Sequence, residues 1–239
     1  MSTGKSEELV GAARRARRHE RTMAEILDAG REELRLHGPG GVTMRAFAKA
    51  VDMTPSGLYR HVSDHNELLG LLSADAYEAV GIAMAQARDR APAGDHATAW
   101  YFIAMAMRTW YKAHLPEFEL LVSPRIINPL PERLVATRGR SIELLVGVCT
   151  AAIEAGQLDP ARSGFPSATV GEQSATSPAT PIALAAFAAL SGHMGFELRG
   201  VYDAMPLDPQ EHYSAYVRAT MKLMGFVVEP GPLVMSTLR

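Results

Sequence analysis

The chain has 239 residues, of which 47% are hydrophobic and 21% are charged, so it is long enough for one large or two modest domains and too apolar for wholesale disorder. Its single cysteine, Cys149, excludes an intramolecular disulfide framework and a zinc or iron–sulfur site built from several cysteines. No uncharged apolar run reaches the roughly 18 to 20 residues that cross a bilayer, and arginines stand where a signal peptide has its apolar core, which predicts a cytoplasmic protein without a membrane partner.

Positive charge is concentrated near the N-terminus, although the net charge is only −2 at pH 7. Residues 14–21 contain five arginines and one acidic residue, Glu20. A basic segment on a compact domain is typical of nucleic-acid-binding proteins, although short arginine runs are also common in solvated tails. We interpret residues 1–20 as a flexible basic arm.

Apolar residues at helical spacing predict a first helix over residues 17–37, which the Gly-Pro-Gly-Gly segment 38–41 ends. Thr43 is a good N-cap for a second helix that ends near Val51. After a tight turn at Asp52, Thr54 is the N-cap of a third helix with Pro55 at its first position, and this helix runs to residue 61.

Asp64 and Glu67 resemble a capping box and predict a fourth helix over residues 64–83. Together these elements predict a helix-turn-helix domain over residues 21–66 and a connecting helix over 67–85. Such a motif can place its second helix in the major groove of DNA while its first helix crosses the backbone.

The remainder of the chain, residues 86–239, keeps helical periodicity. We expect helices over residues 95–114, 141–155, 182–202 and 209–226, and a mobile loop over the small and polar residues 159–181. The helix over 95–114 is apolar on more than one face, which indicates a central position. Strand-like alternation is absent, so the predicted fold class is all-α.

The sequence over residues 42–62, VTMRAFAKAVDMTPSGLYRHV, followed by NELL at 66–69, resembles the TetR family of one-component transcriptional regulators. The resemblance implies a three-helix DNA-binding domain joined to a helical domain, residues 86–239, that binds a ligand and forms the dimer. It also implies a homodimeric regulator of transcription that binds a pseudo-palindromic double-stranded operator. We interpret it as a repressor that a small, largely apolar molecule releases from DNA.

Two residues depart from the family pattern. Asp52 stands in the turn where the family usually has glycine, and aspartate tolerates the left-handed conformation better than most residues. His65 replaces the lysine usually found at the start of the fourth helix, which weakens one phosphate contact because histidine is mostly neutral at pH 7.

The resemblance also implies which side chains contact DNA. Arg45 suits guanine, whereas Tyr59 and His61 resemble the phosphate-contacting pair of the family. Phe47, Ala48 and Leu58 are expected in the core of the domain. The predicted DNA-binding residues are Thr43, Arg45, Thr54, Pro55, Ser56, Gly57, Tyr59, Arg60, His61 and His65.

A ligand pocket is expected between the helix over residues 95–114, the segment 116–121, the helix over 141–155 and the start of the helix over 182–202. Aromatic and Met side chains of the first helix accompany a few polar groups there that could orient a ligand. For any single one of these residues, a place in the core is the simpler interpretation. The candidates are Phe102, Met105, Arg108, Trp110, Tyr111, His114, Phe118, His193 and Glu197.

The dimer interface is expected on the last two helices, because a run as apolar as residues 182–202 needs a partner to cover it. Small residues on one stripe would let two helices approach closely. The predicted interface residues are Ala185, Ala189, Gly192, Gly195, Tyr216, Thr220 and Met224.

No motif for catalysis, a cofactor or a metal is found. His61 and His65 have the spacing of metal ligands, but Asp64 begins a new helix between them and no third ligand is evident. Two alternatives stay open: the same DNA-binding fold controlled by a protein partner, and a helical enzyme with an incidental helix-turn-helix.

Overall fold

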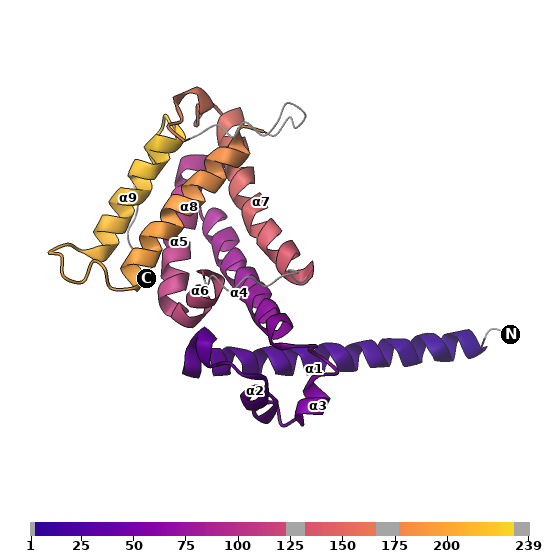
Figure 1. The fold of residues 1–239 in the computed structure, drawn as a ribbon. Helices are drawn as coiled ribbons and strands as arrows, with labels where there is room; N and C mark the ends of the chain where they lie inside the picture. The colour runs from indigo at the N-terminus through magenta and orange to yellow at the C-terminus, as the bar shows by residue number, and fades with distance from the viewer. Residues whose placement is uncertain (1–2, 123–131, 166–176, 232–239) are drawn as a thin grey trace, which may run out of the picture. The chain divides into compact units, whose positions relative to one another are not determined.

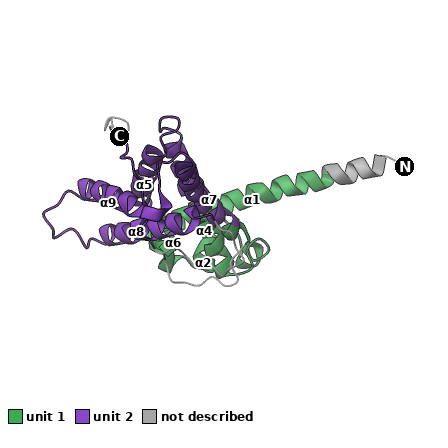
Figure 2. Cartoon of the chain, turned by 90° about the horizontal axis from the view of Figure 1, so that it is seen from above, with its two compact units in different colours: residues 1–76, 116–135 green, residues 77–115, 136–239 purple. Residues whose placement is uncertain are grey.

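The computed structural model describes residues 3–122, 132–165 and 177–231, and it divides into two compact units shown in different colours in Figure 2. Unit 1 comprises residues 1–76 and 116–135, and unit 2 comprises residues 77–115 and 136–239. Over the described residues every element is helical apart from one isolated β-bridge, between Leu158 and Phe226. The all-α prediction is confirmed.

Unit 1 contains three helices at the N-terminal end of the chain (Figure 1): α1 (Thr3–Gly41), α2 (Met44–Ala50) and α3 (Pro55–Leu58). The arm was expected to be flexible over residues 1–20, but α1 is helical from Thr3 onward. A local sequence without helix breakers explains this difference, because Gly4 and Gly11 are the only glycines before Gly30 and no proline precedes Pro39. The predicted break at 38–41 is present as a kink at Gly38, whose φ of 64° lies in the left-handed region that favours glycine.

The core of unit 1 joins α1, α2, α3 and the first half of α4 (His65–Arg88). Gly30 lies where α1 meets this core, and a Cβ atom there would approach Leu72 Cδ2 to 2.6 Å. Phe47, Ala48 and Leu58 are buried as predicted. The other buried members of this cluster are Ile26, Leu27, Leu34, Val42, Val62, Leu68, Leu69, Leu72 and Leu120.

Unit 2 holds most of the longer helices. Helix α5 (His96–Ala113) contacts α8 (Ala179–Leu198) and α9 (Pro209–Met224), and α8 and α9 lie side by side (Figure 1). Helix α7 (Glu132–Glu154) follows α6 (Leu115–Val122) in the chain, and a short 3₁₀ turn, η1 (Pro160–Arg162), contacts α9.

Several boundaries differ from the prediction. Helix α6 was not among the predicted helices; it begins at Leu115, and proline is tolerated in its first turn. Helix α7 begins at Glu132 rather than at 141, and α8 spans Ala179–Leu198 rather than 182–202. Of the predicted loop over 159–181, residues 166–176 lie outside the described residues. Within the described part, residues 160–162 form η1 and α8 begins at Ala179.

Helices α4 and α8 are long and apolar enough to cross a membrane by length and composition alone. Their most apolar windows are 50% and 44% buried inside the protein, as in the core helices of soluble proteins. Their apolar character is therefore accounted for in part by the packing described above.

Candidate nucleic-acid interface

Two threonines begin the two short helices of unit 1. Thr43 Oγ1 accepts a hydrogen bond from the backbone N–H of Ala46 (3.2 Å), and Thr54 Oγ1 accepts one from the N–H of Gly57 (3.1 Å). Pro55 occupies the first turn of α3, where its missing N–H leaves no donor unpaired. Both predicted N-caps are confirmed.

The turn between α2 and α3 depends on Asp52. Its φ of 52° is left-handed, and among the described residues it is the one non-glycine residue with positive φ. The backbone N–H of Met53 donates to the carbonyl of Ala48 (2.8 Å) and closes the turn. Aspartate therefore adopts the conformation for which the family usually has glycine.

The start of α4 carries the predicted capping pattern in a shifted form. The N–H of Glu67 donates to the Asp64 carboxylate (2.8 Å), as an N-cap requires. The Glu67 carboxylate in turn accepts from the N–H of Ser63 (2.6 Å), one residue before the position in a standard capping box. Because α3 ends at Leu58, residues 59–64 form a short connection and not the continuation of α3 that was predicted.

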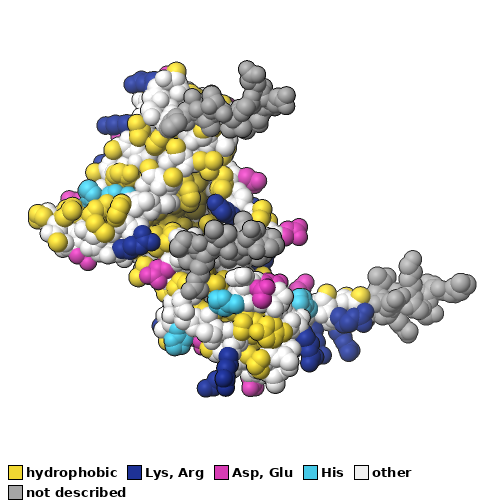
Figure 3. All heavy atoms as spheres, in the orientation of Figure 1, with side chains coloured by type: hydrophobic (Ala, Val, Ile, Leu, Met, Phe, Trp, Pro, Cys, Tyr) yellow, Lys and Arg dark blue, Asp and Glu magenta, His cyan; other side chains and the backbone are white. Residues whose placement is uncertain are grey.

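Most of the predicted DNA-binding residues lie on the surface of unit 1. Tyr59 is 51% exposed although its ring is large and apolar. Lys and Arg side chains gather on the lower side of unit 1 in Figure 3, the side on which α2 and α3 lie in Figure 1. Thr43, Arg45, Thr54, Pro55, Ser56, Tyr59 and Arg60 are exposed, and Gly57, His61 and His65 are half-buried.

Lys49 was missed by the sequence interpretation. It is exposed and lies one helical turn after Arg45 on α2. Both residues line a surface hollow that Thr54 and Pro55, at the start of α3, also line. The i, i+4 spacing of two cations on α2 was the available signal.

The two histidines of this region differ in their surroundings. His65 Nε2–H donates to the backbone carbonyl of Val42 (2.7 Å), so this nitrogen is already engaged. The ring of His61 stacks on His19 of α1, with centroids 5.8 Å apart. His61 Nδ1 is buried without a hydrogen-bond partner among the described residues.

An ion pair within unit 1 connects α1 to α4. Arg31 Nε donates to Asp75 Oδ2 (2.6 Å) and Arg31 Nη2 donates to Asp75 Oδ1 (2.8 Å), which is a bidentate arrangement. The hydrogen bond to Asp75 raises the pKa of Arg31 above its ordinary value, and Asp28 adds to the effect. The guanidinium thus fixes the first half of α4 against the helix that packs on α2.

In unit 2 the polar residues proposed to orient a ligand contact one another. Arg108 donates to both Glu197 carboxylate oxygens (2.8 and 2.6 Å), and the two side chains are 7% and 8% exposed. Lys112 Nζ lies 3.6 Å from the same carboxylate. The charges of Arg108 and Glu197 therefore compensate each other inside unit 2.

His193 is buried in a cluster of aromatic rings on α8, α9 and the segment between them. Its ring is 4.3 Å from Tyr216 and 5.0 Å from His212, measured between centroids. Burial lowers the pKa of His193, and the neighbouring His212 lowers it further. The other groups that face it are Arg108, Glu197, Tyr202 and Tyr213.

The remaining residues of the predicted pocket are mostly core residues of their own units. Met105 and Tyr111 are buried, and His114 Nδ1–H donates to the carbonyl of Trp110 (2.8 Å) while its ring stacks on the indole. Phe102, Trp110 and His114 are half-buried. Phe118 is buried and belongs to unit 1. The predicted pocket stays a prediction.

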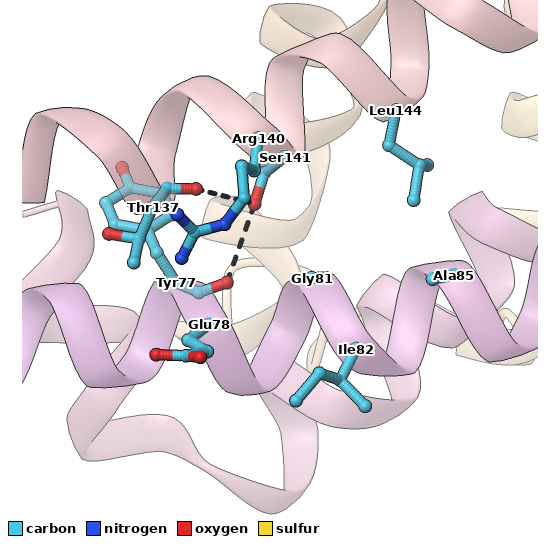
Figure 4. Close-up of a pocket in the computed structure, with 9 residues that line it drawn as sticks. All are labelled: Tyr77, Glu78, Gly81, Ile82, Ala85, Thr137, Arg140, Ser141 and Leu144. Carbon is cyan, nitrogen blue, oxygen red and sulfur yellow. Dashed lines mark hydrogen bonds between the residues drawn. The ribbon is translucent and has the colours of Figure 1, made fainter.

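A described cavity of unit 2 lies elsewhere, between α4 and α7 (Figure 4). None of the nine predicted pocket residues lines it.

Three of the predicted interface residues do not lie at the surface of unit 2. Gly195 of α8 is buried inside the unit, and Thr220 and Met224 are buried because the apolar stripe of α9 faces the core of its own unit. Ala185, Ala189 and Tyr216 are half-buried, and the Tyr216 hydroxyl donates to the carbonyl of Ala189 (3.4 Å). Gly192 is exposed, and beyond the neighbouring backbone of its own helix no atom lies within 4 Å of the position that a Cβ would take.

The exposed stripe of α8 has a four-residue spacing. Leu184, Ala188, Gly192 and Phe196 are all exposed, and Phe196 is 55% exposed. This stripe, and not the one predicted, is the apolar face of α8 that unit 2 leaves uncovered.

Two family models match the chain. The model described as bacterial regulatory proteins, tetR family, matches residues 26–72, and the model described as tetracyclin repressor-like, C-terminal domain, matches residues 100–220. The HTH-type transcriptional regulator Rv1816 of Mycobacterium tuberculosis is 32% identical over 151 residues, which cover 62% of this chain. The match spans 64% of the length of that relative.

Solved structures share the fold. A protein of unknown function from Rhodococcus sp. RHA1 has a TM-score of 0.69 at 19% identity and covers 85% of this chain and 95% of its own. RolR in complex with resorcinol has a TM-score of 0.57 at 16% identity and covers 88% of this chain and 91% of its own. The helix-turn-helix geometry, together with a C-terminal model that matches half of the residues, shows that the chain belongs to the TetR family of bacterial regulatory proteins.

Proposed function

We propose that the protein is a cytoplasmic transcriptional repressor that binds a pseudo-palindromic operator as a homodimer and leaves it when a small molecule binds unit 2. The DNA-binding part rests on the exposure of Arg45 on α2, Ser56 on α3 and Tyr59 directly after α3, while Phe47 and Leu58 of the same helices are buried. Resorcinol is bound to RolR, which has a similar fold, and this supports a small-molecule effector.

The side chains divide into two kinds of DNA contact. Arg45 has a free planar guanidinium at the surface of α2 and suits the O6 and N7 atoms of guanine. Tyr59, Thr43 and Lys49 suit phosphate oxygens, which fix the position of the protein without reading sequence. His65 is a weaker candidate because its Nε2 is bonded to Val42.

The exposed stripe of α8 supports the homodimer. Leu184, Ala188, Gly192 and Phe196 would bury apolar area against the same stripe of a second copy across a two-fold axis. A two-fold dimer presents two copies of α3 to two half-sites about one helical turn of DNA apart.

The experiment is to select an operator from random duplex DNA with the purified protein and to measure affinity by fluorescence anisotropy at several salt concentrations. Arg45→Ala should cost roughly 1 to 3 kcal/mol and relax the preference at one base position. Tyr59→Phe should weaken binding to all sequences alike. Arg90→Ala is the control, because Arg90 is exposed in unit 2.

Three results would contradict the proposal: no selected motif, a single unpaired half-site in footprinting, or the same loss in the Arg90 control as in Arg45→Ala.

A further inference from the structure

A groove of about 240 Å³ lies in unit 2 between the second half of α4 and α7. Figure 4 shows side chains from both helices around it. On α4 it is lined by Glu78 and Ile82, which are exposed, and by Tyr77, Gly81 and Ala85, which are half-buried. None of the nine predicted pocket residues lines the groove, which shares with the predicted pocket the helix over 141–155 through Ser141 and Leu144.

Small residues leave the space open. Gly81 faces Ser141, and a Cβ at Gly81 would lie 3.1 Å from Ser141 Oγ, so the two helices are close at this point. Ser141 Oγ–H is 3.4 Å from the carbonyl of Thr137 and 3.5 Å from that of Tyr77. One turn further on α4, Ala85 adds only a methyl group to the lining.

The groove has an apolar side. Ile82 is 54% exposed, and Leu144 points toward α4 from the opposite helix (Figure 4). Covering such side chains contributes roughly 25 cal/mol for each Å² of apolar surface removed from water. An apolar body of limited size is therefore the complement of this side.

The groove also has a cationic end. Arg140 lines it and has no ion pair or hydrogen bond within the part of the chain that the structure describes. Its guanidinium extends toward α4 beside Thr137, whereas Glu78 lies across the α4 ribbon from it in this view (Figure 4). Burial raises the pKa of Tyr77, so the phenol at this end stays protonated and available as a donor.

We propose that this groove binds a small amphipathic anion, an apolar ring or short chain that carries one carboxylate. The carboxylate accepts from Arg140, and the apolar body lies on Ile82, Ala85 and Leu144. The volume corresponds to about eight waters at ~30 Å³ each, which suits a ligand of roughly ten non-hydrogen atoms. The role of this groove as the effector site of the repressor rests on the proposed function, whereas the binding of the anion does not.

The test measures binding by isothermal titration calorimetry to the full chain without DNA. The probe is 4-methylbenzoate, and 4-methylbenzyl alcohol is its uncharged match in size. The acid should bind at least tenfold more tightly than the alcohol, because a charge-assisted bidentate contact is worth more than a neutral one. Arg140→Gln should weaken binding of the acid by about tenfold and leave that of the alcohol unchanged.

A second variant tests the location of the binding site without disturbing the core of unit 2. Ile82→Glu puts a carboxylate at an exposed position of the groove and should abolish binding of the acid. Gln86→Glu is the matched control, because Gln86 is exposed on the same helix outside the groove, and it should bind as the natural protein does. Circular dichroism confirms the helical content of each variant.

The site is wrong if 4-methylbenzoate does not bind at millimolar concentration, if Ile82→Glu binds it as tightly as the natural protein, or if the alcohol binds equally well. Release of operator DNA is measured separately by anisotropy. If binding depends on Arg140 but does not change the affinity for DNA, the groove is confirmed as a binding site and its role as the effector site is refuted.

Discussion

Breaking the ion pair between Arg31 and Asp75 should loosen unit 1 where α1 meets α4. The pair is bidentate at 2.6 and 2.8 Å, and the Asp75 side chain is 17% exposed whereas that of Arg31 is 47% exposed. Hydrogen bonds to charged groups contribute about 1.5 to 3 kcal/mol when sheltered, and exposed pairs contribute about 0 to 1 kcal/mol. The half-exposed arginine places this pair between the two ranges, at about 1 to 2 kcal/mol.

The assay is a double-mutant cycle with Arg31→Gln, Asp75→Asn and the two combined. Amide hydrogen exchange in peptides from α1 and the first half of α4 reports local opening. Loss of about 1 to 2 kcal/mol of stabilisation should make this opening about 5 to 30 times more frequent. Operator affinity should fall in the same variants, because α1 packs on α2.

The control is the bidentate pair between Arg35 and Glu32 on the exposed face of α1, where both side chains are more than half exposed. Its removal should cause no measurable change, because solvent screens it. A coupling below about 0.3 kcal/mol between Arg31 and Asp75 would show that their pair is equally screened and would refute the reasoning.

Three further predictions follow from single positions. Asp52→Val should destabilise the turn between α2 and α3 by about 1 to 2 kcal/mol, because a β-branched residue does not tolerate a φ of 52°, whereas Asp52→Gly should cause no loss in urea unfolding. Gly192→Arg should give a folded monomer by light scattering, because beyond the neighbouring backbone of its own helix no atom lies within 4 Å of the new Cβ. A dimer would show that the interface lies elsewhere. The pKa of His193 is lowered in the folded state, so as the pH falls the unfolded chain takes up a proton at this histidine before the folded chain does. The free energy of unfolding should therefore fall as the pH drops below about 6.5, and this fall should be smaller in His193→Gln than in the natural protein.

Features that depend on neighbours in sequence were predictable. The caps at Thr43 and Thr54 each bind a backbone N–H three residues ahead, and the turn at Asp52 depends on the tolerance of one residue type for positive φ. Such interactions need no knowledge of the tertiary fold. The exposure of most of the side chains proposed to bind DNA was predictable for the same reason, because Phe47, Ala48 and Leu58 between them had to face the core.

Features that depend on distant partners were not predictable. Arg108 and Glu197 are 89 residues apart, and nothing in the sequence indicates that they bind each other and not a ligand. The groove at Arg140 was missed for the same reason, because its lining comes from α4 and α7, whose packing is set by the whole unit.

Helix α8 shows why periodicity did not predict which of its residues are exposed. A helix with apolar residues on all sides has no stripe that stands out, so the sequence could not distinguish the face toward α9 from the face toward solvent. The structure buries Ala186, His193 and Gly195 and leaves Leu184, Ala188, Gly192 and Phe196 exposed. The small residues Ala188 and Gly192 lie in the middle of the exposed stripe, and the large ones lie at its ends. Two such stripes crossing at Gly192 could approach closely, with each Phe196 packing against the partner helix, which is why a single arginine at Gly192 should be enough to separate the copies.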